Sequence, residues 1–156
     1  MLLVSIFNTP VGNLEVAHDE HFIFNASFTD KSGAPAQNQL AHLIASELKA
    51  YFDDPHHRFQ LTLKPQGSLF QQKVWNTLLV IPVGRTVTYG ELATKLQSSP
   101  RAVGQACKCN PLALFVPCHR VVGKHDLGGY MGNPNAISYK KICSLMKQKS
   151  SDELNL

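Results

Sequence analysis

Two helix-start signals close together in the second half of the chain constrain the fold most. The first is Thr88, followed three residues later by Glu91, and the second is Ser99 with Pro100 directly after it. Threonine and serine cap helix N-termini, a glutamate three positions on completes a capping box, and proline fits the first helical position. Apolar residues at helical spacing follow each signal. We therefore predict two short helices joined by a tight turn, a helix-turn-helix candidate.

The second helix of this pair is predicted to carry polar and basic side chains on one side. Those expected to point away from its apolar stripe belong to Arg101, Gln105 and Lys108. A further helix is predicted ahead of the pair, because Ser68 and Gln71 repeat the capping-box pattern. Many helix pairs bind nothing, so this pattern alone is a weak indication of function.

Charge is distributed unevenly along the chain, within an overall net charge of +4. Residues 1–65 hold four Lys and Arg against seven Asp and Glu (−3), whereas residues 66–156 hold eleven against four (+7). A basic half is typical of a protein that binds a polyanion such as nucleic acid. A solvated lysine-rich surface explains the charge equally well, and the helix pair beside it favours nucleic acid.

The sequence pattern of the first half of the chain predicts a small sheet followed by one helix. Turn residues separate short apolar or alternating runs at residues 2–7, 14–17 and 22–28. Apolar residues then recur at helical spacing from Leu40 to Phe52, and Pro55 ends that stretch. Alternation at residues 59–63 predicts a last strand.

A chain of 156 residues has room for one compact domain or for two small ones that share an interface. We expect an α+β fold: a small antiparallel sheet with one helix as a scaffold at residues 1–65, and a mainly helical domain with the helix-turn-helix at residues 66–150. Residues 151–156 are expected to form a flexible tail.

The cysteine content and the apolar start indicate the compartment. Residues 1–7 are too short for a membrane span and lack the layout of a secretory signal. We expect a cytoplasmic or nucleoid-associated protein with no membrane segment, and free thiols at Cys107, Cys109, Cys118 and Cys143. No metal site is expected, because these cysteines and His119 lack the two-residue spacer typical of zinc ligands.

The triplet Cys118-His119-Arg120 follows a predicted buried strand at residues 112–116 and precedes another apolar pair. A thiolate is an effective nucleophile, and a cationic or hydrogen-bonding neighbour lowers the thiol pKa. His119 can assist Cys118 only if the backbone turns there, and Pro117 makes a turn plausible. Taken singly, a buried small hydrophobe and a hydrogen-bonded core histidine are the ordinary interpretations of these two residues.

The run Pro117-Cys118-His119-Arg120-Val121-Val122 resembles the active-site motif of the O6-alkylguanine-DNA alkyltransferases, also called methylated-DNA–protein-cysteine methyltransferases. Other segments are similar to the family's first helix, recognition helix, hinge and pocket loop, in the same order: Thr88-Tyr89, Ser99-Pro100-Arg101-Ala102-Val103-Gly104, Asn110-Pro111 and Gly128-Gly129-Tyr130. The resemblance covers about residues 68–132 and is looser over the first half.

The resemblance implies DNA repair by direct transfer of an alkyl group, such as methyl, from O6-alkylguanine in double-stranded DNA to Cys118. O4-alkylthymine is a further candidate substrate. The protein would bind the minor groove as a monomer, flip the damaged base, need no cofactor and be consumed in one turnover.

The resemblance also implies roles for single residues. His119, through a water, would draw the proton from Cys118, and Tyr89 would donate to the leaving oxygen. Asn110 would hold the turn after the recognition helix, and Arg101 would enter the base stack. Further DNA contacts would come from Ala102, Gln105, Lys108 and Arg120. The base pocket would be formed by Tyr89, Val121, Tyr130, Met131 and Gly132.

Two positions depart from the family pattern. Met146 falls where a glutamate of the family bonds the active-site histidine, which makes His119 a weaker base. Met131 stands where the family has a serine, so only its backbone N–H can bond the O6 atom, and the pocket size stays open.

Two other functions fit parts of the sequence. An alkyltransferase-like protein would mark the lesion without transfer, but such proteins lack the acceptor cysteine, and Cys118 is present. A cysteine hydrolase would use Cys118 and His119 on an acyl substrate, and would leave the basic helix pair unexplained. Steep loss of binding with salt separates a DNA-directed protein from a hydrolase.

Overall fold

A computed structural model describes residues 2–54, 56–82 and 85–123. The chain divides into two compact units, each made of two stretches of sequence. The first unit comprises Met1–Gln66 and Pro111–Phe115, and the second comprises Gly67–Asn110 and Val116–Leu156. Sheet and helices together confirm the predicted α+β class.

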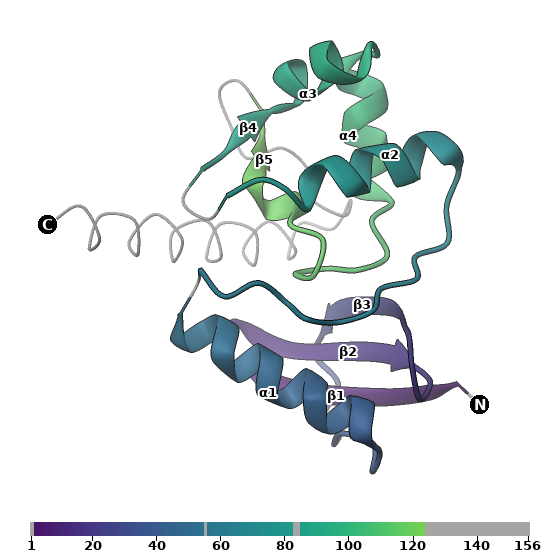
Figure 1. The fold of residues 1–156 in the computed structure, drawn as a ribbon, viewed down its shortest axis with the longest axis vertical. Coiled ribbons are helices and arrows are strands. Elements are labelled where there is room, and N and C mark those ends of the chain that lie inside the picture. Colours follow the sequence, from purple (N-terminus) through teal and green to yellow (C-terminus); the bar gives the residue numbers. More distant parts are fainter. Residues whose placement is uncertain (1, 55, 83–84, 124–156) are drawn as a thin grey trace, which may run out of the picture. The chain divides into compact units, whose positions relative to one another are not determined.

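The first unit is a three-stranded antiparallel sheet with a helix along it (Figure 1). Its strands are β1 (Leu3–Thr9), β2 (Gly12–His18) and β3 (Ile23–Thr29), in that order, and its helix is α1 (Gln39–Asp53). This arrangement confirms the predicted sheet and helix. Alternate strand residues and one face of α1 form the core, in which the fully buried members include Leu14, Val16, Ile23, Ala26 and Ile44.

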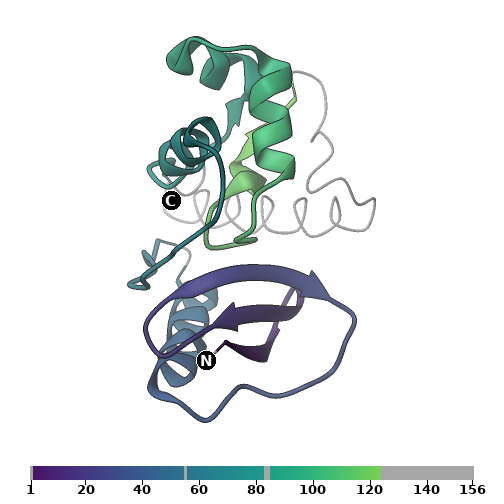
Figure 2. The ribbon, with the colours of Figure 1, turned by 90° about the vertical axis from the view of Figure 1, so that its right-hand side faces the viewer.

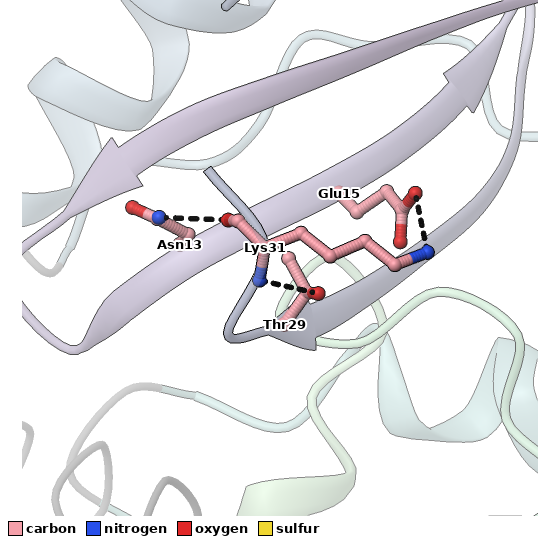
Figure 3. A network of polar contacts seen from close by, with 4 residues as sticks. All are labelled: Asn13, Glu15, Thr29 and Lys31. Carbon is pink, nitrogen blue, oxygen red and sulfur yellow. Dashed lines mark hydrogen bonds and ion pairs between the residues drawn. The ribbon is translucent and has the colours of Figure 1, made fainter. Parts of the chain in front are cut away.

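The chain after β3 is tied back to β2 by polar contacts (Figure 3). The Asn13 side chain donates to the Lys31 carbonyl at 3.0 Å, and the Lys31 N–H donates to Thr29 Oγ1 at 3.1 Å. Lys31 Nζ also lies 3.8 Å from the Glu15 carboxylate. Exposed ion pairs contribute little, so the bonds to the Lys31 backbone define this turn.

Helix α1 begins and ends as its sequence predicts. Asn38 caps it by accepting from the Ala41 N–H at 2.8 Å, and the helix ends at Asp53. The strand predicted at residues 59–63 does not form, since only Leu63 makes a bridge, to Ile23. Before it, the Gln60 N–H donates to the Glu47 carboxylate of α1 and not to a neighbouring strand.

The second unit has three helices and two short strands. They are α2 (Leu69–Leu78), β4 (Val87–Thr88), α3 (Tyr89–Leu96), α4 (Pro100–Lys108) and β5 (Val121–Val122), with a 3₁₀ turn, η1 (Cys118–Arg120), before β5. Helix α4 packs against both α2 and α3 (Figure 2). The Trp75 indole, buried on α2, donates to the Ala106 carbonyl of α4 at 3.0 Å.

The predicted helix caps of this unit are confirmed. Ser68 and Gln71 form a reciprocal capping box at α2, Thr88 caps α3, and Ser99 caps α4 with Pro100 in its first turn. Residues 97–99 join α3 to α4, and the chain reverses there because Gln97 takes the left-handed conformation (φ 54°). Within the described residues, no helix is long and apolar enough to cross a membrane.

Candidate active site

Cys118 is fully buried, at the start of η1. Its thiol donates to the Cys107 carbonyl, with 3.6 Å between sulfur and oxygen, and its N–H donates to the Val116 carbonyl at 2.8 Å. The Cys107 carbonyl also accepts from the Asn110 N–H at 3.1 Å. The thiol therefore lies against the C-terminal end of α4. A buried cysteine is an ordinary core residue, and here the hydrogen bond of its thiol fixes the sulfur against α4.

The backbone turns at Cys118 and is no longer extended. Such a turn is the condition under which His119 could assist the thiol. Residues 118–120 form a 3₁₀ turn in which the Arg120 N–H donates to the Pro117 carbonyl at 3.0 Å. His119 therefore lies inside a turn directly after the thiol and not in a strand.

The strand predicted at residues 112–116 does not form, although these residues are all buried as expected. Leu112 alone makes a bridge, to Ala26 of β3, and Leu114 has a φ of 72°. An extended strand needs a negative φ at every residue, so the left-handed Leu114 turns the chain.

Asn110 spans this turn. It is buried, and its side-chain amide donates to the Val116 carbonyl at 3.1 Å. One asparagine side chain thus joins the end of α4 to the residue that receives the Cys118 N–H.

Tyr89 is brought beside the segment after Cys118 by the pairing of β4 and β5. Val87 pairs with Val121, and Thr88, the cap of α3, pairs with Val122 in parallel. Tyr89 follows directly as the first residue of α3 and is half-buried. Its ring faces α4, since a Cβ added at Gly104 would lie 3.9 Å from Tyr89 Cδ1. Val121, a predicted pocket residue, is fully buried.

The proposed DNA-contacting residues of α4 share one face. Arg101, Gln105 and Lys108 are exposed at positions i, i+4 and i+7, and Ala102 is half-buried. The opposite side of α4 contains the buried stripe of Val103, Ala106 and Cys107 that the sequence predicts.

Arg120 makes a contact that the sequence does not reveal. Its guanidinium donates to the Ile81 carbonyl, just after α2, and the side chain is half-buried. Nothing in the pattern of residues 117–122 indicates that backbone acceptor, because Ile81 is far away in sequence.

Several predicted residues lie outside the described part of the chain. They are Tyr130, Met131, Gly132, Cys143, Met146 and the tail at residues 151–156. Among the described residues, no group of three or more His, Cys, Asp or Glu side chains is placed to hold a metal ion.

Comparisons with known proteins identify the family of this chain. Residues 69–149 match the family described as 6-O-methylguanine DNA methyltransferase, DNA binding domain. A methylated-DNA–protein-cysteine methyltransferase of Methanosarcina mazei is 47% identical over 80% of this chain and 85% of the relative.

Two solved structures from Mycobacterium tuberculosis are also similar. The O6-methylguanine methyltransferase has a TM-score of 0.83 at 30% identity, over 96% of this chain and 94% of that one. OGT in complex with DNA has a TM-score of 0.80 at 31% identity, over 94% and 93%. The chain therefore belongs to the methylated-DNA–protein-cysteine methyltransferase family, whose reaction is direct-reversal DNA repair.

Proposed function

We propose that Cys118 is the residue that accepts the alkyl group, taken from O6-alkylguanine in double-stranded DNA, and that each molecule acts once. One observation carries this proposal: the Cys118 thiol is hydrogen-bonded to the end of the same helix, α4, that exposes Arg101, Gln105 and Lys108. A basic helix face and a nucleophile are thus attached to one rigid element.

The proposed reaction is a displacement at the alkyl carbon. The sulfur of Cys118 forms a bond to that carbon, the bond from carbon to O6 breaks, and its electron pair goes to guanine. The thiol proton leaves through His119, and Tyr89 supplies a hydrogen bond or proton to the oxygen, so that unmodified guanine is restored. The thioether that remains has no easy reversal, and for that reason the protein is consumed.

The burial of Cys118 supports base flipping as part of the proposal. A fully buried sulfur cannot reach a base atom inside a stacked duplex, so the target nucleotide has to leave the stack. In this proposal α4 lies in the minor groove, and Arg101 fills the space that the nucleotide vacates. Phosphate contacts by Lys108, and by Arg120 near the flipped nucleotide, offset part of the unstacking free energy.

The pocket for the base is assigned to Tyr89 and Val121 with the loop at residues 130–132. No step of the displacement needs a metal or an organic cofactor. One chain carries both the DNA-binding face and the thiol, so we assign the activity to a monomer, in the cytoplasm or its nucleoid. O4-alkylthymine carries an alkyl group on a comparable exocyclic oxygen and is proposed as a second substrate.

The test is the intact mass of the protein after mixing with a duplex that carries one O6-methylguanine. We expect a gain of one methyl group, located on the peptide that contains Cys118. The Cys118→Ala variant should gain nothing and still bind the lesion, while Cys109→Ala, which removes an exposed thiol near the same helix end, should be methylated like the wild type.

A mass gain on another cysteine would contradict the assignment to Cys118. No gain at all, with lesion-selective binding retained, would indicate a protein that marks damage without repairing it.

A further inference from the structure

The turn at Pro111–Phe115 leads from the end of α4 to Cys118, yet it belongs to the first unit. Leu114 is held there at a φ of 72°, in the left-handed region that a leucine rarely adopts. Such a conformation persists only where surrounding contacts impose it, and it is frequent beside functional sites. The contacts that impose it therefore matter for what the turn positions.

Strand β3 holds the first part of the turn by two backbone hydrogen bonds. The Ala26 N–H donates to the Pro111 carbonyl at 2.7 Å, and the Ala113 N–H donates to the Ala26 carbonyl at 2.9 Å. Both bonds use the backbone of one residue, so the sheet fixes the chain on either side of Leu112.

An aromatic side chain of the first unit holds the last part of the turn. The ring of Phe59 lies edge-to-face against Phe115, with 5.0 Å between centroids and 86° between planes. The same ring stacks on Tyr51 of α1 at 4.8 Å and 23°. Each arrangement is one that aromatic pairs prefer.

The position of Phe59 is itself fixed by α1. The Glu47 carboxylate accepts from the Gln60 N–H, and it lies 2.8 Å from His57 Nε2. These contacts bracket Phe59 on both sides along the chain. The ring that contacts Phe115 is therefore anchored to a helix and not to a free loop.

Phe115 is followed by the residues that orient the thiol. The Val116 carbonyl accepts from the Asn110 side chain at 3.1 Å and from the Cys118 N–H at 2.8 Å. A displacement of Phe115 would move this carbonyl, and with it the start of η1. The contact between the Cys118 thiol and the Cys107 carbonyl depends on the same placement.

We propose that Phe59 is a positioning residue for Cys118: its ring holds Phe115 in the left-handed turn, and the turn places the sulfur for transfer. This role rests on the proposed function of Cys118 as the alkyl acceptor. The first unit, which contains none of the reacting groups, thereby determines how fast the thiol reacts.

The test compares three variants of the full chain at a temperature where each is folded by circular dichroism. Phe59→Leu removes the ring and Phe59→Tyr keeps it. Phe52→Leu is the matched control, because Phe52 lies edge-on to Tyr51 (5.2 Å, 88°) and makes no ring contact with Phe115 in the described part of the chain. The transfer rate is measured at saturating O6-methylguanine duplex, beside the duplex concentration that gives half-saturation.

We expect Phe59→Leu to lower the saturated transfer rate on the order of tenfold, since small misplacements of reacting groups have effects of this size or more. Half-saturation should stay within about twofold, because the DNA-contacting face of α4 is unchanged. Phe59→Tyr and Phe52→Leu should transfer at close to the wild-type rate.

A second measurement does not depend on DNA. The rate of iodoacetamide alkylation of Cys118, read on its own peptide by mass, is followed against pH. In Phe59→Leu the midpoint of this profile should move to lower pH, because the thiol loses an acceptor that favours its protonated form. Phe59→Tyr should restore the wild-type midpoint.

An unchanged rate and an unchanged midpoint in Phe59→Leu would overturn the proposal, as would equal losses in Phe59→Leu and Phe52→Leu or a failure of Phe59→Tyr to rescue. If wild-type protein is not methylated by the duplex, the proposed function of Cys118 fails separately, and the alkylation profile alone decides the positioning role.

Discussion

The sulfur of Cys118 lies 3.6 Å from the backbone carbonyl of Cys107, and the thiol donates the hydrogen bond. Only the protonated sulfur can make this bond, whereas only the thiolate is an effective nucleophile. In the proposed reaction, attack on the alkyl carbon therefore has to break this contact first. In the structure the Cys118 thiol is buried and hydrogen-bonded at the end of α4.

This arrangement predicts a fixed order of thiol modification. Cys109 is exposed, whereas Cys118 is fully buried. In folded protein, iodoacetamide should modify Cys109 faster than Cys118, by on the order of tenfold or more, since access limits the reaction. Quantitative mass analysis of the two peptides measures both rates. In denaturant the two thiols should react alike, and equal rates in the folded protein would contradict the burial of Cys118.

Asn110→Ala should weaken both stability and transfer. The substitution removes the amide that donates to the Val116 carbonyl and leaves that acceptor without this donor. Loss of such a buried bond costs about 1–3 kcal/mol of unfolding free energy. Urea unfolding measures the change, and single-turnover kinetics should show slower methylation. Asn76→Ala, at an exposed position of α2, is the control that should leave both unchanged.

Gly67→Ala should destabilise the second unit. A Cβ at this position would lie 2.4 Å and 2.6 Å from two ring atoms of the buried Trp75. Overpacking of this kind costs about 1–3 kcal/mol. Trp75 is the one tryptophan of the chain, so its fluorescence during urea unfolding reports the loss directly. Gly90→Ala has its nearest neighbour atom at an ordinary 3.7 Å, and should leave the unfolding midpoint unchanged or slightly higher.

The salt dependence of DNA binding should show whether the basic face of α4 contacts the DNA phosphates. Lys108 is proposed to contact a phosphate, so replacing it with alanine should reduce the slope of log affinity against log salt by about 1. Fluorescence anisotropy over a salt series gives the slope. Lys49→Ala, on the exposed surface of α1, removes the same charge type from the first unit and should leave the slope unaltered.

The change in folding stability at acidic pH should depend on the Asp19 carboxylate. The backbone N–H groups of His21 and Phe22 each donate to its carboxylate at 2.7 Å, and they hold the pKa of Asp19 below its usual value of 3.8. Stability from this carboxylate is full above pH 3.8 and is lost as pH falls through the lower folded-state pKa. Asp19→Asn should therefore be less stable than wild type near neutrality, and the difference should shrink below pH 3.8.

Thermal unfolding at a series of pH values tests this, with Asp30→Asn as the exposed-carboxylate control. A difference between Asp19→Asn and wild type that stays constant with pH would show that the Asp19 charge plays no part.

Features determined by neighbouring residues could be predicted from the sequence. The caps at Ser68, Thr88 and Ser99 depend on a side chain and an N–H a few residues away, so a local pattern is enough to locate each helix start. The exposed face of α4 followed from helical spacing in the same way.

Features determined by distant partners could not be predicted. Residues 112–116 are apolar and buried in a turn just as they would be in a strand, and the turn depends on Ala26, far earlier in the chain. Arg120 follows Cys118 and His119 in sequence, yet its guanidinium donates to the Ile81 carbonyl. No periodicity encodes either partner, because the Ala26 backbone and the Ile81 carbonyl are placed by other elements of the fold.

Pro111–Phe115 lies late in the sequence but belongs to the first unit. The chain therefore cannot be divided at any single position into two fragments that each contain one complete unit. A fragment that starts at Gly67 would keep Pro111–Phe115 but lose Ala26, which hydrogen-bonds to Pro111 and Ala113, and Phe59, whose ring contacts Phe115. Its apolar turn would face water without its strand partner. We therefore expect the turn that precedes Cys118 to form only when the sheet of the first unit is present.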